Sequence, residues 1–155
     1  MERKTKIHAE EGKQELFITR EFDLPVELLF RAYIDPEIVE QWMGTRVLKL
    51  ENKKHGSWQF ETSDAQGNVV FQSGGAFHDI VPNQKIIRTF EMDNTPFAAQ
   101  LEFLEFEKLM NGTSKLTMHI IFKSVADRDQ LLQLPFAQGI NMAHNRLEEV
   151  VMHLK

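Results

Sequence analysis

The sequence predicts an α+β fold in which one curved, antiparallel sheet of seven strands wraps around a long C-terminal helix. Three patterns support this prediction. Two short helical segments follow the first strand, six strand-like segments occupy residues 46–123, and an apolar stripe with helical spacing closes the chain. Strands joined by short turns form antiparallel sheets, and such sheets normally carry helices on one face only.

The first elements are a strand over Leu16–Asp23 and two helices that meet at a corner. Apolar and polar residues alternate through this strand. Pro25 suits the first position of a helix because its missing N–H would have no partner there. Asp35-Pro36 repeats this start signal, and a residue before proline disfavours helical backbone, so the first helix must end there and a second must begin. Gly44 is the expected stop of the second helix.

The later elements are six strands and the closing helix. Gly74-Gly75 lies inside the longest strand, where glycine usually marks a bulge or bend. Asp127–Gln133 is expected to add one or two helical turns. The closing helix should span about 20 residues, or ~30 Å. The six strands are expected at 46–52, 58–62, 69–80, 85–92, 97–107 and 114–123, and the helical stripe consists of Phe136, Ile140, Ala143, Leu147, Val150, Val151 and Leu154.

Composition limits the function classes. With 155 residues, the chain is expected to hold a flexible segment over residues 1–14 and a single domain over 15–155. The net charge of −5 and the scattered basic residues speak against a nucleic acid partner. Neither a secretory signal nor an apolar run of about 20 residues occurs, and the lack of cysteine excludes disulfides and thiolate zinc sites. We expect a cytoplasmic protein without metal or cofactor.

Five segments in the same order resemble a known family. The segment "FDLPVELLFRAYIDPEIVEQWMG" resembles the opening of the domain related to the Hsp90 ATPase activator, a member of the START-like helix-grip (SRPBCC) superfamily. "HGSWQF" resembles its Gly-Gly-x-Trp-x-Phe strand, with His55 in place of the first glycine. "GAFHDIVPNQKIIRTF", "GTSKLTMHIIF" and "GINMAHNRLEEVVMHL" resemble its later strands and last helix. The resemblance covers residues 16–154 and implies a hydrophobic cavity between the sheet and the last helix, closed at one end by the two short helices.

Apolar side chains on the strands and the last helix are the candidate lining of such a cavity. Twelve phenylalanines could line it or equally fill a solid core. Trp42 and Trp58 could contact a ligand, although we favour packing at the helix corner and the first hairpin. The proposed lining is Phe60, Phe71, Phe77, Leu101, Phe103, Met118, Ile120, Ile140 and Leu147, with Trp42 beside it.

Three polar residues are candidate ligand anchors: Arg88, Asn141 and His144. For Arg88 we favour the cavity rim, because burying an unpaired charge costs several kcal/mol. His144 could point into the cavity mouth as an anchor or general base, although a partly exposed ring paired with Glu148 is the favoured alternative. His119 is expected to face solvent. No metal-binding spacing, nucleophile motif, phosphate loop or dinucleotide fingerprint occurs.

Three functions follow as hypotheses, in decreasing order of preference. The first is a non-catalytic module that binds an apolar or amphipathic, lipid-like or polycyclic molecule. The second is an enzyme of the cyclase or aromatase kind, in which His144 moves a proton. The third is a partner of an Hsp90-type chaperone, with a role in stress responses. The last two follow from the resemblance.

Overall fold

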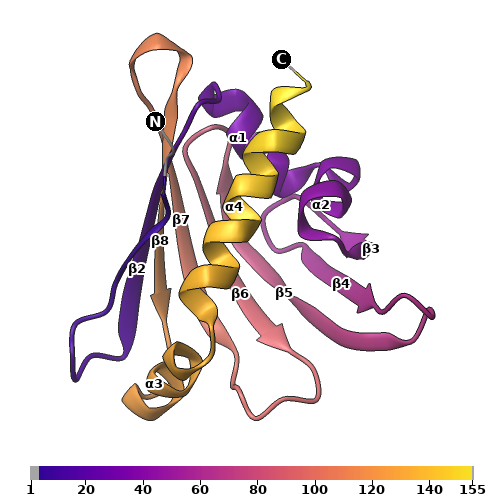
Figure 1. Cartoon of the computed structure of the whole chain (residues 1–155), viewed down its shortest axis with the longest axis vertical. Coiled ribbons are helices and arrows are strands. Elements are labelled where there is room, and N and C mark those ends of the chain that lie inside the picture. The colour runs from indigo at the N-terminus through magenta and orange to yellow at the C-terminus, as the bar shows by residue number, and fades with distance from the viewer. Residues whose placement is uncertain (1–3, 155) are drawn as a thin grey trace.

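The computed structural model describes residues 4–154 and shows an open, curved sheet that grips one long helix (Figure 1). The fold class expected from the sequence is confirmed, with eight strands in the described residues instead of the expected seven. The elements are β1 (Lys6–His8), β2 (Glu15–Phe22), α1 (Val26–Ile34), α2 (Pro36–Met43), β3 (Arg46–Leu50), β4 (Ser57–Ser63), β5 (Val69–Val81), β6 (Lys85–Met92), β7 (Gln100–Lys108), a 3-10 turn (Met110–Gly112), β8 (Ser114–Ile121), α3 (Val125–Gln133) and α4 (Phe136–Met152).

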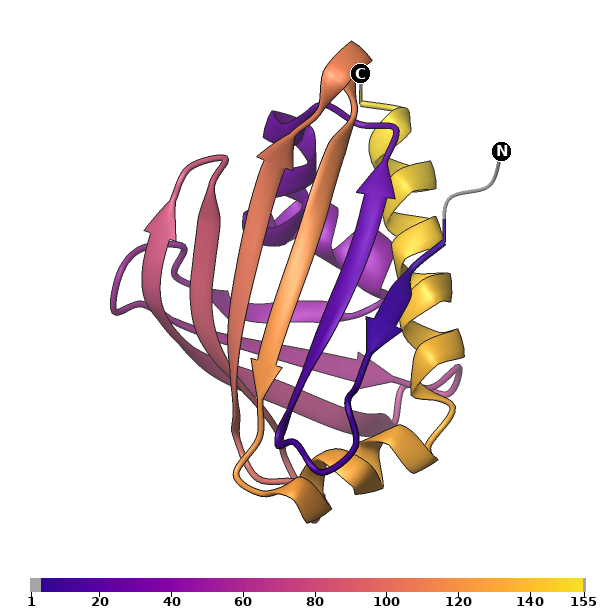
Figure 2. The ribbon, with the colours of Figure 1, turned by 90° about the vertical axis from the view of Figure 1, so that its left-hand side faces the viewer.

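All strand pairs are antiparallel, and their order across the sheet is β1-β2-β8-β7-β6-β5-β4-β3. Helix α4 crosses the inner face of the sheet, and α1 and α2 lie beside its C-terminal half (Figure 1). The outer face of β2, β8 and β7 is uncovered (Figure 2). The core forms where α1, α2 and α4 meet the inner face, and Leu29, Leu104 and Leu147 are fully buried there.

The extra strand, β1, lies within the segment that was expected to be flexible. It pairs with β2 through Lys6, Ile7 and His8, and it runs beside α4 (Figure 2). Part of the segment 1–14 therefore belongs to the sheet, and residues 1–3 lie outside the described range. Sequence alone misses β1 because three residues are too few to show an alternating pattern.

The helix corner forms as the sequence predicts. The Asp35 side chain accepts a hydrogen bond from the Glu37 backbone N–H at 3.1 Å, and Pro36 occupies the first turn of α2. Asp35 itself has extended backbone angles, as a residue before proline prefers, so α1 stops there. Gly44 closes α2 with a left-handed φ of 62°. This corner positions Tyr33 and Trp42 against the sheet.

Backbone geometry near β4 and β5 explains why glycine is required or favoured at two positions. A methyl group on Gly75 would come within 2.0 Å of the Thr89 carbonyl oxygen, so only glycine fits at this point of β5, beside its neighbour β6. His55 has a φ of 68°, the left-handed region that glycine adopts most easily, and this explains why the resembling motif carries glycine there. At Gly139, in contrast, nothing lies within 4 Å of an added methyl group, so no close neighbour requires a glycine at this position of α4.

Candidate functional site: a polar cluster on the inner face of the sheet

The predicted lining residues divide between the two faces of the sheet. Phe60, Phe77, Met118, Ile120 and Leu147 are buried on the inner side, and Ile140 packs against that core partly buried. Phe71 pairs with Thr62, on the same face as Phe60, but remains 39% exposed near the free end of the β4–β5 hairpin.

Leu101 and Phe103 lie on the outer face instead of the inner one. In β7 the buried side chains are Glu102, Leu104 and Phe106, and the Phe106 ring packs against α1. Residues of opposite parity therefore point away from the helices. The Phe103 ring centroid lies 5.8 Å from His119, whose ring stacks on Phe17 at 4.2 Å. His119, which is only partly exposed, also bonds to Glu15 at 2.7 Å.

Trp42 packs at the helix corner, as favoured. Its indole N–H donates to the Ala32 carbonyl at 2.7 Å, and its ring meets the edge of Tyr33 at 5.3 Å. Because this donor is already satisfied inside the chain, Trp42 holds Tyr33 in place and has no hydrogen bond to offer a ligand.

Arg88 lies in the interior rather than at the rim, because it has a partner that the sequence reading did not identify. Its Nε donates to Glu102 Oε1 at 2.9 Å, and the two side chains retain only 11% and 4% of their accessible surface. The other Glu102 oxygen accepts from Gln100 at 2.7 Å. Arg88 on β6 and Glu102 on β7 are direct cross-strand partners, so the pairing register itself creates this ion pair.

Two aromatic rings enclose the Arg88 guanidinium. Its central carbon lies 5.4 Å from the Trp58 ring centroid and 5.9 Å from that of Tyr33, within reach of cation–π attraction. Phe60 and Phe90 extend the aromatic wall from Trp58, at 4.7 and 5.7 Å. We name Tyr33, Trp58, Arg88, Gln100 and Glu102 the inner polar cluster.

The inner polar cluster has donors without partners. Within residues 4–154, the two terminal nitrogens of Arg88 and the Tyr33 hydroxyl make no hydrogen bond, and the buried Trp58 Nε1 also lacks a partner. Burial raises the pKa of Tyr33 far above its usual range, with Arg88 lowering it and Glu102 raising it, so the phenol remains a donor at any physiological pH. Buried polar groups are normally paired, and within residues 4–154 Trp58 Nε1 is the donor of this cluster that is buried without a partner.

Asn141 and His144 do not join this cluster. Asn141 accepts from the Thr5 backbone N–H at 2.9 Å, and His144 Nδ1 bonds to the Thr5 hydroxyl at 2.6 Å. Glu148, the expected partner of His144, instead accepts from Arg20 at 3.0 Å, and Asn145 accepts from Arg20 at 2.8 Å. We name Thr5, Arg20, Asn141, His144, Asn145 and Glu148 the N-terminal latch.

His144 is completely buried within the latch, against the expectation of partial exposure. Desolvation, with a smaller contribution from Arg20, lowers its pKa to about 3. Its Nε2 lacks a partner within the described residues, and Phe22 meets the ring edge-on at 5.5 Å. A neutral ring enclosed by the chain has the geometry of a structural residue, not that of a general base at a cavity mouth.

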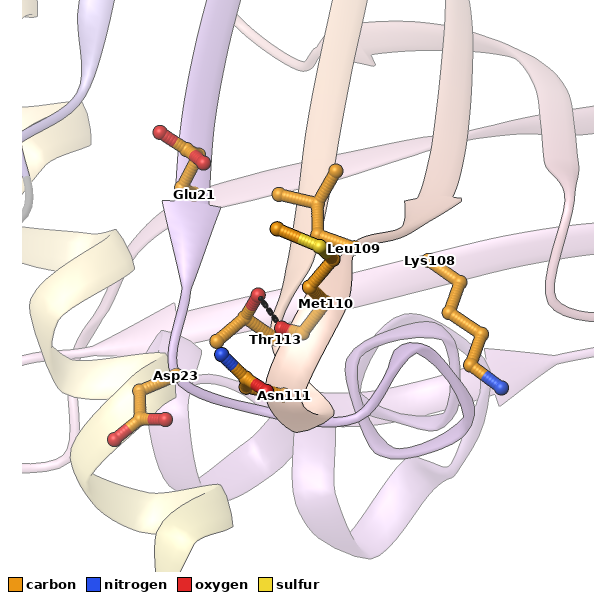
Figure 3. A pocket seen from close by; sticks show the side chains of 7 residues that line it. All are labelled: Glu21, Asp23, Lys108, Leu109, Met110, Asn111 and Thr113. Atoms are coloured by element: carbon orange, nitrogen blue, oxygen red, sulfur yellow. Dashed lines mark hydrogen bonds between the residues drawn. The ribbon is translucent and has the colours of Figure 1, made fainter.

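A surface pocket of about 910 Å³ lies elsewhere, at the end of β2 and the β7–β8 turn (Figure 3). Its lining is Glu21, Asp23, Lys108, Leu109, Met110, Asn111 and Thr113, and the Thr113 hydroxyl donates to the Met110 carbonyl at 2.7 Å. This pocket is shallow and shares no residue with either polar cluster. Across residues 4–154, no cluster of three or more His, Asp or Glu side chains is placed to hold a metal ion, and none of the helices combines the length and the apolar character that a membrane span requires.

Comparison with known proteins identifies the family. Residues 23–152 match the model of the family described as "Activator of Hsp90 ATPase homolog 1-like protein". The chain belongs to this family. The resemblance seen in the sequence is thereby confirmed, and the match includes all of α1 to α4 and the inner polar cluster.

Solved structures agree with this family's fold. Protein Ms6760 from Mycobacterium smegmatis is similar with a TM-score of 0.83 and 17% identity, covering 95% of this chain and 96% of that one. A protein from Rhodobacter sphaeroides is similar with a TM-score of 0.83 and 19% identity, covering 97% of this chain and 100% of that one. A protein from Staphylococcus epidermidis is similar with a TM-score of 0.78 and 22% identity, covering 94% of each chain. A comparison with curated proteins gives no significant match. These similarities establish the fold alone.

Proposed function

We propose that this protein binds an apolar or amphipathic small molecule on the inner face of the sheet, between the sheet and α4. The observation that carries the proposal is the inner polar cluster, in which two aromatic rings flank the Arg88 guanidinium. Within residues 4–154, the terminal nitrogens of Arg88, the Tyr33 hydroxyl and the Trp58 N–H have no hydrogen-bond partner. Small-molecule sites combine an apolar lining with a few polar groups of this kind. The Arg88 side chain keeps 11% of its surface accessible, so a ligand could reach part of it.

The free end of the inner face supports the same proposal. Phe71, Phe90 and Ile140 are all incompletely buried, although each lies on the inner side or on α4 facing it. Removing this apolar surface from water would favour binding by about 25 cal/mol per Å², before the costs of association. An apolar body would rest on these side chains, and its polar end would reach the cluster.

Two exposed phenylalanines on opposite faces provide a matched test. Phe71 is 39% exposed on the inner face, and Phe17 is 36% exposed on the outer face. We expect Phe71→Ser to weaken binding of the neutral dye Nile red about fivefold or more, and Phe17→Ser to leave it unchanged. Amide NMR shifts on titration should follow the inner-face strands. Shifts confined to Phe17, Phe103 and His119, or a loss of binding in Phe17→Ser, would refute the proposal.

A second candidate function is supported by the family description alone. The family is named for an activator of the Hsp90 ATPase, so this protein is a candidate partner of an Hsp90-type chaperone. Mixing it at micromolar concentration with such an ATPase should then change the rate of ATP hydrolysis. An unchanged rate, together with no co-purification, would remove this candidate and leave the small-molecule proposal intact.

A further inference from the structure

The charge balance of the inner polar cluster limits the chemistry of its ligand. The cluster contains one cation, Arg88, and one anion, Glu102, joined at 2.9 Å. Gln100, Trp58 and the protonated Tyr33 contribute no charge. The interior site is therefore neutral before any ligand arrives, and every charge there is already compensated.

The hydrogen-bonding capacity of the cluster is not balanced in the same way. Both Glu102 oxygens already accept hydrogen bonds, one from Arg88 and one from Gln100. The terminal nitrogens of Arg88, the Trp58 N–H and the Tyr33 O–H have no acceptor within residues 4–154. The cluster thus offers donors in excess while carrying no net charge.

These two facts act differently on different ligands. A carboxylate would find donors but would leave the enclosed site with a net negative charge next to Glu102, and buried charge without compensation is strongly disfavoured. An ammonium group would find only donors and the positive charge of Arg88, so its binding is disfavoured as well. A neutral oxygen acceptor satisfies the donors and leaves the charge balance unchanged, and hydrogen bonds from a charged donor are the stronger kind.

We propose that the ligand is an uncharged molecule whose apolar body carries a carbonyl-type oxygen, which accepts hydrogen bonds from Arg88 and from Trp58 or Tyr33. This inference rests on the proposed function and names the ligand class of the same site. Trp58 Nε1 lies close to Gly75: a methyl group added at Gly75 would come within 3.0 Å of this nitrogen and within 2.0 Å of the Thr89 carbonyl oxygen, so the backbone of β6 packs closely beside this donor.

Three naphthalenes that differ only in one substituent test the inference. They carry an acetyl, an ethyl or a carboxylate group at the same ring position, and their affinities can be measured by calorimetry. Acetylnaphthalene should bind about tenfold more tightly than ethylnaphthalene, since only the ketone accepts hydrogen bonds. Naphthoate should bind no more tightly than the hydrocarbon.

Glu102→Gln is the decisive variant because it changes the charge of the cluster while keeping an amide oxygen for Arg88. The variant cluster carries one net positive charge, so the affinity for naphthoate should rise about tenfold while that for acetylnaphthalene changes little. Tyr33→Phe serves as a second variant. It removes a hydroxyl that has no hydrogen-bond partner among residues 4–154. This change should reduce the preference for the ketone over the hydrocarbon without altering the affinity for the hydrocarbon.

The outcomes separate this inference from the proposed function. If all three compounds bind on the inner face with equal affinity, or naphthoate binds most tightly to the unmodified protein, the neutral-acceptor inference is wrong and the binding function stands. If none binds, or all bind on the outer face, both fail. A shift in favour of naphthoate in Glu102→Gln, with melting behaviour otherwise native, would establish the charge argument.

Discussion

The inner polar cluster and the N-terminal latch contain the same kinds of residues and yet have different relations to the chain. Each has a buried arginine paired with a glutamate: Arg88 with Glu102, and Arg20 with Glu148. In the latch, both Arg20 terminal nitrogens donate to side chains of α4. In the inner cluster, both Arg88 terminal nitrogens remain without acceptors in residues 4–154.

The sequence separation of the partners explains the difference. Latch contacts join residues more than 120 positions apart, such as Thr5 with Asn141 and Arg20 with Glu148, and so they tie the N-terminal strands to α4. The inner pair joins neighbouring strands of one meander, which the sheet ladder already holds together. The latch contacts therefore hold the N-terminal strands to α4, while the sheet ladder already holds the inner pair together.

The largest expected effect comes from breaking the inner ion pair. Glu102→Leu leaves Arg88 buried without its counter-charge and should cost about 3–5 kcal/mol of unfolding free energy. The double variant Arg88→Met with Glu102→Leu removes both charges and should recover most of that loss. Urea unfolding measures both. If the double variant is as unstable as the single one, the loss of stability does not come from the unpaired charge of Arg88, and this prediction is wrong.

A smaller effect should appear as pH dependence of the latch. The His144 pKa is about 3 in the folded state and about 6.5 when unfolded, so the unfolded state binds the extra proton first. The stability that depends on this neutral ring is present above pH 6.5 and is lost as the pH falls toward 3. At pH 5 the loss should be about 2 kcal/mol.

The variant His144→Leu isolates this contribution. The unfolding free energy of the native protein should fall about 2 kcal/mol more than that of the variant between pH 7.5 and pH 5. Other histidines titrate in both proteins and cancel in the difference. Arg20 and Glu148 are the charged groups that face the latch from β2 and α4, and both are retained. If the unfolding free energies of the two proteins fall equally between pH 7.5 and pH 5, His144 is more accessible to protons than its burial indicates.

The smallest effect concerns a single hydrogen bond of the latch. Thr5→Val removes the hydroxyl that bonds to His144 and should cost about 1 kcal/mol. Thr19→Val is the matched control. The Thr19 hydroxyl makes no hydrogen bond within residues 4–154, and the residue pairs with β1 through its backbone, which the substitution keeps. Urea unfolding of both variants gives the comparison. An equal effect of the two changes would show that the Thr5 bond adds nothing.

Local signals in the sequence were sufficient for most of the fold. Asp35-Pro36 and Gly44 set the helix corner through backbone restrictions that act within a few residues. The apolar stripe predicted α4, although the helix ends at Met152 rather than Leu154. Short turns predicted the antiparallel meander. These features depend on neighbours along the chain, which is why they can be read without coordinates.

The sites were much less predictable, and β7 shows why. In "LEFLEFE", Leu101 and Phe103 have one parity, and Leu104 and Phe106 have the other. Both parities look apolar, so the pattern does not reveal which face is inside, and Glu102 was not recognised as buried. Because Glu102 was not recognised as a buried partner, the sequence interpretation placed Arg88 at the cavity rim. His144 was misjudged because its partner, Thr5, directly precedes β1, a strand too short to be recognised from the sequence.

By itself, the sequence determined the order of the helices and of all strands except β1, because propensity, capping and proline act over a few bonds. Only the tertiary structure decided which face of β7 is inside, which charge neutralises Arg88 and what covers His144. Those outcomes depend on strand register and on residues up to 139 positions apart, and the free energy of burying a polar group is set by such neighbours.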